Sequence, residues 1–200
     1  MQTVWPLFAS IVTFAVSMSI SPGPNNLMVT ASGANFGFRR TVPHMLGISF
    51  GFPVMLLAVG LGLGQALAAW PQVHEVLRYV AAAYLLYLAW RIATAGGPGE
   101  AVARGRPFTF LQAAAFQWVN PKAWVIALSA VATYTAPDGS ALMQILLIGA
   151  VFVVAAFLSL AVWAAFGTLI AGVLKSPRAL RAFNLCMAGL LVLSLVPVFF

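Results

Sequence analysis

The residues best suited to chemistry lie where an apolar segment is interrupted. Pro22 and Pro24 lack a backbone N–H and push the preceding residue away from helical geometry, so a helix should unwind there for about one turn. The turn before the break keeps free carbonyls, and the half-helix after it presents free N–H groups that suit a carboxylate. The interruption reads Ser21-Pro22-Gly23-Pro24-Asn25-Asn26, and its two asparagines add amide donors and acceptors.

A second interruption lies in the other half of the chain. It reads Asn120-Pro121-Lys122, with Gln117 about one turn earlier. A lysine at the centre of a membrane helix costs about 2.5–3.5 kcal/mol, which is tolerated when its ammonium reaches a cavity, a carbonyl end or an anionic ligand. Paired interruptions in two halves point to a transporter's binding site. We therefore predict a substrate site built from Pro22, Gly23, Pro24, Asn25, Asn26, Gln117, Asn120, Pro121 and Lys122.

Both interruptions have a simpler interpretation. Proline kinks are common in membrane helices, and asparagine can serve only to join packed helices; a Pro-Gly-Pro sequence followed by two asparagines makes this explanation weaker. Lys122 could instead extend its long side chain to the membrane interface.

The acidic residues, Glu75, Glu100 and Asp138, lie at the ends of apolar segments or in loops, and none lies within the core of a segment. A proton relay or a site for metal ions or polyamines would need a carboxylate within the membrane. The sequence therefore favours a neutral or zwitterionic small molecule as substrate. His44 and His74 form no ligand pair at helical spacing, so we expect neither a metal nor a cofactor.

The composition of the chain indicates whether water or lipid surrounds it. It has 200 residues, of which 62% are hydrophobic and 6% are charged, whereas soluble domains carry about 25% charged residues. The net charge of +7 does not indicate nucleic-acid binding, because the basic residues are scattered at the ends of apolar segments. We predict an all-α integral membrane protein surrounded by lipid.

Six segments have about the length of a membrane span, which is about 20 apolar residues. A breaker-rich connection, residues 96–107, divides them into two sets of three within a single domain, 1–200. Because each set has an odd number of spans, the halves 1–95 and 108–200 must have opposite orientations, as in inverted-repeat transporters. Segments one and four would be the broken ones. The segments are about 4–36, 42–68, 74–93, 108–134, 141–173 and 179–199.

Basic residues predict the orientation. Connections one, three and five carry Arg39, Arg40, Arg91, Arg104, Arg106, Lys175, Arg178 and Arg181, whereas the others offer only Arg78. Connections one, three and five should therefore be cytoplasmic, with both termini outside. If the first segment were re-entrant, the N-terminus would lie inside.

Small residues recur at the spacing of helix-packing motifs. Gly33 and Gly37 form one GxxxG pair, and Gly47 and Gly51 form another. We expect helix backbones to approach closely at these positions.

The two interruptions resemble the LysE/RhtB family of bacterial amino-acid exporters. The likeness extends over nearly the whole chain and is greatest to the cysteine/O-acetylserine exporter branch, through Pro22–Asn26, Leu88–Ala93, Gln117–Asn120 and Trp163. It implies a secondary transporter, not an enzyme, for efflux of a small neutral amino acid across the inner membrane, coupled to the proton gradient. Many family members carry an acidic residue midway along the fifth span, where this chain reads Phe157-Leu158-Ser159-Leu160.

Alternatives stay open at this stage. Export of homoserine, threonine or basic amino acids is one, although the missing carboxylate argues against basic substrates. A membrane-embedded enzyme would need a nucleophile–base pair or a metal constellation, which the sequence lacks. A non-transporting scaffold would explain the GxxxG pairs but not the two breaks. A homo-oligomer is compatible with the sequence.

Overall fold

The computed structural model describes residues 4–95, 106–136, 141–174 and 176–199, and every regular element within them is helical. This confirms the predicted all-α class. Most of the predicted central connection lies outside the described residues, as do Asp138 and Lys175. The elements are α1 (Val4–Ile20), α2 (Pro24–Phe36), α3 (Phe38–Ala58), a π-helical turn (Val59–Leu63), α4 (Gly64–Ala69), α5 (Pro71–Ala93), α7 (Phe110–Phe116), a 3-10 turn (Gln117–Val119), α8 (Pro121–Tyr134), α9 (Ala141–Val173), α10 (Pro177–Leu193) and α11 (Val196–Phe199).

Several of these helices are long and apolar enough to cross a membrane. Three continuous stretches qualify, Phe38–Ala69, Glu75–Ala93 and Ala141–Val173, and α1 with α2 qualifies as a bent pair. The predicted fourth segment is divided into α7 and α8, and α10 has only 17 residues. The architecture fits a membrane protein, and the predicted count of six spans stays a prediction.

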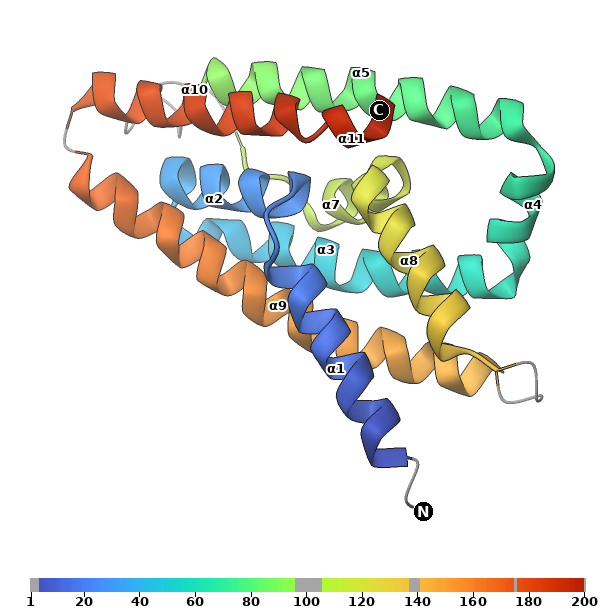
Figure 1. Ribbon diagram of the computed structural model, residues 1–200. Helices are drawn as coiled ribbons and strands as arrows, with labels where there is room; N and C mark the ends of the chain where they lie inside the picture. Colours follow the sequence, from blue (N-terminus) through green and yellow to red (C-terminus); the bar gives the residue numbers. More distant parts are fainter. Residues whose placement is uncertain (1–3, 96–105, 137–140, 175, 200) are drawn as a thin grey trace.

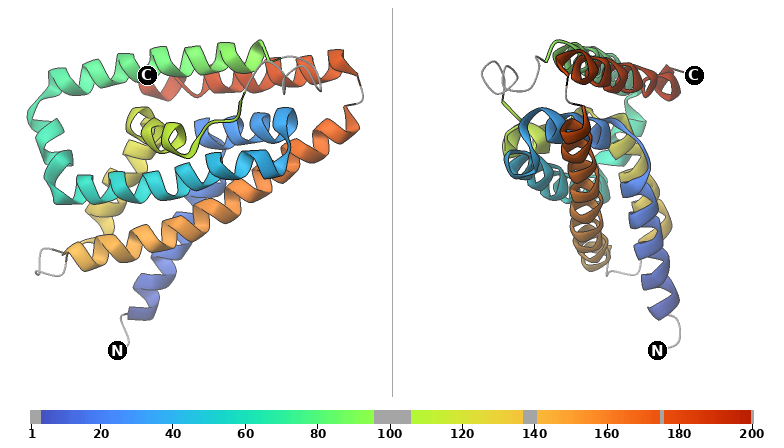
Figure 2. Two further views of the ribbon diagram at one scale, coloured as in Figure 1. Left: turned by 180° about the vertical axis from the view of Figure 1, so that it is seen from behind. Right: turned by 90° about the vertical axis from the view of Figure 1, so that its left-hand side faces the viewer.

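Helix α9 is the element around which the other helices gather. It packs against α1, α2 and α3 along its length, and α10 packs against α5 in a separate pair. Figure 1 shows α9 crossing the molecule diagonally below α2 and α3, while α5 and α10 lie side by side along the top. The end-on view of Figure 2 shows α1 and α9 descending separately from this upper layer. Helices of both halves of the chain are thus interleaved.

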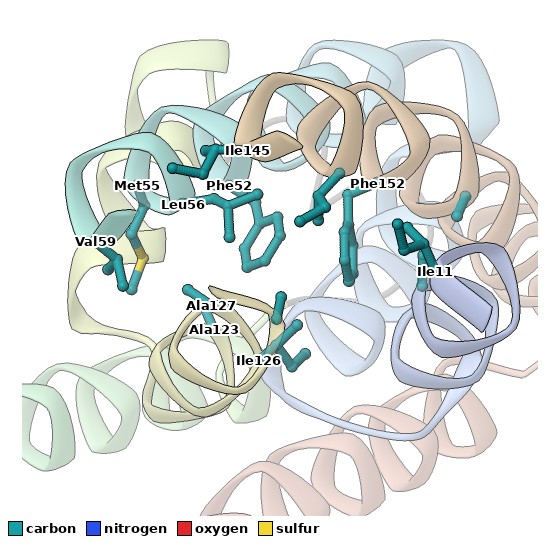
Figure 3. Close-up of a cluster of buried hydrophobic side chains, with 14 residues drawn as sticks. Ile11, Phe52, Met55, Leu56, Val59, Ala123, Ile126, Ala127, Ile145 and Phe152 are labelled. Carbon is teal, nitrogen blue, oxygen red and sulfur yellow. The ribbon is translucent and has the colours of Figure 1, made fainter. Parts of the chain in front are cut away.

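A cluster of apolar side chains joins α1, α3, α8 and α9. Phe52 and Leu56 of α3 meet Phe152 of α9, with Ile126 of α8 and Ile11 of α1 closing the cluster (Figure 3). The rings of Phe52 and Phe152 are 4.8 Å apart. Phe52, Ile126 and Phe152 of this core also line a cavity at the two helix breaks.

The outward surface is apolar as well. Large side chains on α5 and α9 are more than half exposed, among them Val76, Trp90, Met143, Leu158 and Leu169. A water-soluble monomer does not expose apolar side chains on this scale. Lipid is the solvent that this surface fits.

Glycines allow the tightest helix contacts. A Cβ at Gly33 of α2 would collide with the backbone of Ala164 in α9, and one at Gly167 would collide with the backbone of Thr30. Gly47 and Gly51 likewise face the backbone of α7. The expectation of close packing therefore holds at these positions.

Two glycines have a conformational role instead. Gly37 was expected to pack a helix, but a Cβ there would meet no atom of the described residues within 4 Å. Its backbone has φ 81° and ψ 163°, and it forms the turn between α2 and α3. Gly62, with φ 112° and ψ −4°, interrupts the helical path before α4. These backbone conformations are open to glycine and strained for other residues.

Candidate functional site

The first break separates α1 from α2, whose axes differ in direction by 54°. α1 ends at Ile20 and α2 begins at Pro24, because the intervening prolines cannot donate to the helical ladder. At the start of α2, the backbone N–H groups of Asn25 and Asn26 have no acceptor among the described residues. The break therefore offers free donors at the positive end of a 13-residue helix.

The side chain of Asn26 stabilises this break from within. Its Nδ2 donates to the carbonyl of Ser19 at 2.8 Å and to that of Ser21 at 2.9 Å. Ser159 of α9 donates a further hydrogen bond to the Ser19 carbonyl at 2.9 Å. The amide donors of Asn26 are thus used to satisfy the end of α1, which the sequence could not indicate.

The second break is capped more completely. Asn120 is the N-cap of α8, and its side chain accepts from the backbone N–H of Lys122 at 3.2 Å. Its carbonyl accepts from Ala123 and Trp124. Pro121 occupies the first helical position, where its missing N–H costs nothing. The start of α8 consequently has fewer free donors than the start of α2.

Lys122 connects the two breaks. Its Nζ donates to the carbonyl of Ser21 at 2.6 Å, to the Ser21 hydroxyl at 2.7 Å and to the Pro22 carbonyl at 3.3 Å. A Cβ at Gly23 would lie 2.7 Å from Lys122 Cδ, so the glycine makes room for the lysine. The ammonium thus reaches the carbonyl groups at the first break.

A pair of amides makes a second connection. Asn25 Nδ2 donates to Gln117 Oε1 at 2.9 Å, and Gln117 Nε2 donates back to Asn25 Oδ1 at 3.2 Å. Gln117 is fully buried and also donates to the Ala113 carbonyl at 2.9 Å. The pair joins α2 to the end of α7, residues that are 92 positions apart in the chain.

A small cavity lies where these contacts converge. Six of the nine predicted site residues line it: Gly23, Asn25, Asn26, Gln117, Asn120 and Lys122. Its remaining wall is mainly apolar and includes Phe52, Phe152 and Leu160. The cavity therefore combines one ammonium and several amides with an apolar surface, which suits a small polar molecule that carries a short side chain.

The predicted prolines lie on the other side of the breaks. Pro22, Pro24 and Pro121 line a larger cavity that extends toward α5 and the end of α10. Gly23 and Lys122 line both cavities. These two residues form the partition between them.

Three serines at the breaks were not among the predicted site residues. Ser21 binds the lysine ammonium, and Ser19 and Ser159 complete the hydrogen bonds at the end of α1. Ser159 did leave a signal, because it is the single hydroxyl-bearing residue between Gln144 and Thr168 in an apolar helix. Substrate binding by the nine residues singled out in the sequence stays a prediction.

A cavity between two broken helices in an apolar bundle is an arrangement typical of membrane transport. Comparison with known families supports this interpretation, since the family model described as LysE type translocator matches residues 16–198. The chain belongs to the LysE type translocator family. This confirms the resemblance seen in the sequence and makes the chain a transporter, not an enzyme.

Curated relatives of this LysE type translocator cover almost its full length. A protein of Salmonella paratyphi A is 30% identical over 97% of this chain and 98% of its own length. A protein of Escherichia coli strain K12 is 29% identical over the same shares. Both are named cysteine/O-acetylserine efflux protein. No solved structure matches this translocator.

Proposed function

We propose that this translocator exports a small neutral amino acid or derivative, of the cysteine and O-acetylserine class, across the bacterial inner membrane. The observation that carries the proposal is the meeting of both helix breaks at one cavity through Lys122. The near full-length likeness to proteins named for cysteine/O-acetylserine efflux supports the choice of substrate class.

The cavity suggests how a zwitterion would bind. Its carboxylate would accept from the free N–H groups of Asn25 and Asn26 and from the Lys122 ammonium. Charge-assisted hydrogen bonds of this kind are about twice as strong as neutral ones. The side-chain oxygens of Gln117 and Asn120 would orient the substrate, and its short side chain would contact the apolar wall.

The charge of the cavity favours a neutral substrate over a cationic one. Among the described residues, none of those that line it carries a carboxylate, whereas Lys122 contributes a positive charge. A lysine or arginine substrate would place a second cation there without a counter-charge. Export of basic amino acids is therefore the less favoured alternative.

The same contacts suggest how access alternates. We propose six spans arranged as a 3+3 inverted repeat, in which α1–α2 and α7–α8 are the two broken spans. Lys122 with Ser21, and Asn25 with Gln117, join elements from opposite halves. A substrate carboxylate that competes for the lysine would loosen this connection, so that the halves can rock about the site. Coupling to the proton gradient is part of the proposal.

Counterflow in proteoliposomes tests the function. Purified protein should exchange radiolabelled O-acetylserine and cysteine, exclude lysine, and accumulate substrate when a pH gradient is imposed. Lys122→Ala should abolish exchange, whereas Arg178→Gln, which replaces an exposed cation of α10 outside the cavity, should not. Equal exchange of lysine would overturn the neutral-substrate assignment, and no exchange of any amino acid would overturn the function.

Cysteine labelling tests the proposed topology. The chain has one cysteine, Cys186, so Cys186→Ala supplies a cysteine-free background. Single cysteines at Arg40 and Arg178 should react with an impermeant maleimide from the cytoplasmic side. One at Trp70 should react from the outside. Labelling of the Arg40→Cys and Trp70→Cys variants from the same side of the membrane would contradict the six-span arrangement.

A further inference from the structure

A second cavity lies at the opposite end of α2 from the breaks. It is enclosed by α2, α3, the end of α5 and the segment before α7. From Asn26 to Asn35 the axis of α2 rises by about 14 Å, so the two cavities are separated by most of this helix. In the proposed topology the second one opens toward the cytoplasm. The polar residues that line it are Ser32, Asn35, His44, Arg91 and Arg106.

His44 is the unusual member of this group. Its side chain is only 2% exposed, and neither ring nitrogen has a hydrogen-bond partner among the described residues. The ring packs against Phe108, with 5.1 Å between the ring centres. A neutral imidazole has one donor and one acceptor, and buried polar groups of native proteins are nearly always satisfied. A ligand in the cavity would supply the missing partner.

The other polar groups divide into occupied and available ones. Asn35 exchanges two hydrogen bonds with Asn184, at 2.8 and 3.0 Å, and also donates to Ala31. Ser32 is bonded to Thr41 at 3.0 Å. These groups are already satisfied and hold the wall of the cavity together.

Arg91 and Arg106 are the available cations. Neither forms an ion pair within the described part of the chain, and no described lining residue is acidic. A guanidinium matches a carboxylate through two parallel hydrogen bonds. The lining of the cavity therefore includes two anion-binding groups and one uncharged hydrogen-bonding group.

We infer that this cavity is an entry site for the amino acid on the cytoplasmic side. Arg91 and Arg106 bind its carboxylate, and its ammonium donates to the unprotonated nitrogen of His44. The substrate then passes along α2 to the cavity between the breaks. A lipid phosphodiester would pair with the arginines but has no donor for the acceptor nitrogen of His44, whereas the ammonium of an amino acid supplies that donor. This inference rests on the proposed function.

Inverted membrane vesicles, which present the cytoplasmic face outward, provide the kinetic test. Uptake of radiolabelled O-acetylserine is measured against its external concentration. Arg91→Gln and Arg106→Gln should each raise the KM about tenfold, as expected for loss of a charge-assisted pair, and leave the maximal rate unchanged. Arg91→Lys should restore part of the affinity. His44→Phe, which keeps an aromatic ring against Phe108, should also raise the KM.

The matched control is Arg40→Gln, which removes an exposed cation from the same end of the protein without altering the cavity lining. A KM increase as large as that of Arg91→Gln would mean that the general surface field attracts the substrate, and would overturn the site. A lowered maximal rate at unchanged KM in the Arg91 and Arg106 variants would also overturn it.

Binding to the purified protein separates the remaining outcomes. Affinity for O-acetylserine is compared between wild type and Arg91→Gln in phosphatidylcholine nanodiscs, with and without phosphatidylglycerol. Weaker O-acetylserine binding by Arg91→Gln than by wild type in both lipid mixtures supports the entry site. A difference in affinity that occurs only with phosphatidylglycerol would assign the cavity to lipid. If the wild-type protein transports O-acetylserine and the variants have the same KM, only the entry-site inference fails. If the wild-type protein transports no amino acid, the proposed function fails. The binding comparison then still shows whether the second cavity binds O-acetylserine.

Discussion

Replacement of Lys122 by methionine separates a structural from a transport role. The variant keeps the length and the apolar stem of the side chain but loses its ammonium. It removes two short hydrogen bonds to Ser21, at 2.6 and 2.7 Å, and a longer one to Pro22. Hydrogen bonds to charged groups contribute about 1.5–3 kcal/mol each, so the loss of the two short bonds to Ser21 costs about 3–6 kcal/mol.

An opposing effect offsets most of this loss. An ammonium within the membrane costs about 2.5–3.5 kcal/mol, and the substitution removes that cost. The free energy of unfolding should therefore fall by only about 0–3 kcal/mol. We expect Lys122→Met to insert and fold, yet to lose transport, because the substrate carboxylate no longer meets a cation.

The assays are thermal unfolding in detergent, followed by size-exclusion chromatography, and counterflow of O-acetylserine in proteoliposomes. Ser21→Ala is the matched control, since it removes one acceptor of Lys122 but leaves the carbonyl bonds and the charge. It should retain most of the transport rate. A transporting Lys122→Met protein would refute the reasoning, and so would a variant too unstable to purify.

Three other predictions concern contacts that position the site. Double-mutant cycles with Asn25→Ala and Gln117→Ala should give a coupling free energy of about 1–2 kcal/mol in unfolding measurements, because two reciprocal hydrogen bonds join these amides; additive effects would contradict the pairing. Gly33→Ala should lower the free energy of unfolding by about 1–3 kcal/mol, since its Cβ meets the backbone of α9. Gly172→Ala, whose Cβ would meet no described atom within 4 Å, should raise it by about 0.5–1 kcal/mol. Gly37→Ala should lower the free energy of unfolding by about 1–3 kcal/mol through backbone strain, since its Cβ would meet no described atom within 4 Å. An unchanged melting temperature would count against the strain.

Local chemistry explains why the breaks were predictable. Pro22 and Pro24 cannot donate to a helix, and Asn120 before Pro121 is disfavoured from helical geometry, whatever surrounds them. The boundaries of α2 and α8 at their proline residues follow directly. The membrane location was equally predictable from the sequence, because a chain with so many apolar and so few charged residues cannot form a water-facing surface.

The use of each polar side chain was not predictable, because it depends on which neighbours folding brings within hydrogen-bond distance. Asn25 and Asn26 are adjacent and identical in type, yet one pairs with Gln117 and the other satisfies the end of α1. Likewise, Gly37 fits a packing motif in the sequence but forms a turn. Spacing along a helix does not reveal which face meets another helix.

By itself, then, the sequence determined the class of protein, its solvent and the two places where helices must break, since these follow from hydropathy and from the missing N–H of proline. Tertiary structure alone decided that Lys122 bridges the breaks and that Ser21 and Ser159 take part. It also placed His44 in the lining of a second cavity, with no hydrogen-bond partner among the described residues. The physical reason is that hydrogen bonds in a low-dielectric interior are short-ranged and directional. They are set by the crossing of helices that lie far apart in the chain, which no local pattern of residues encodes.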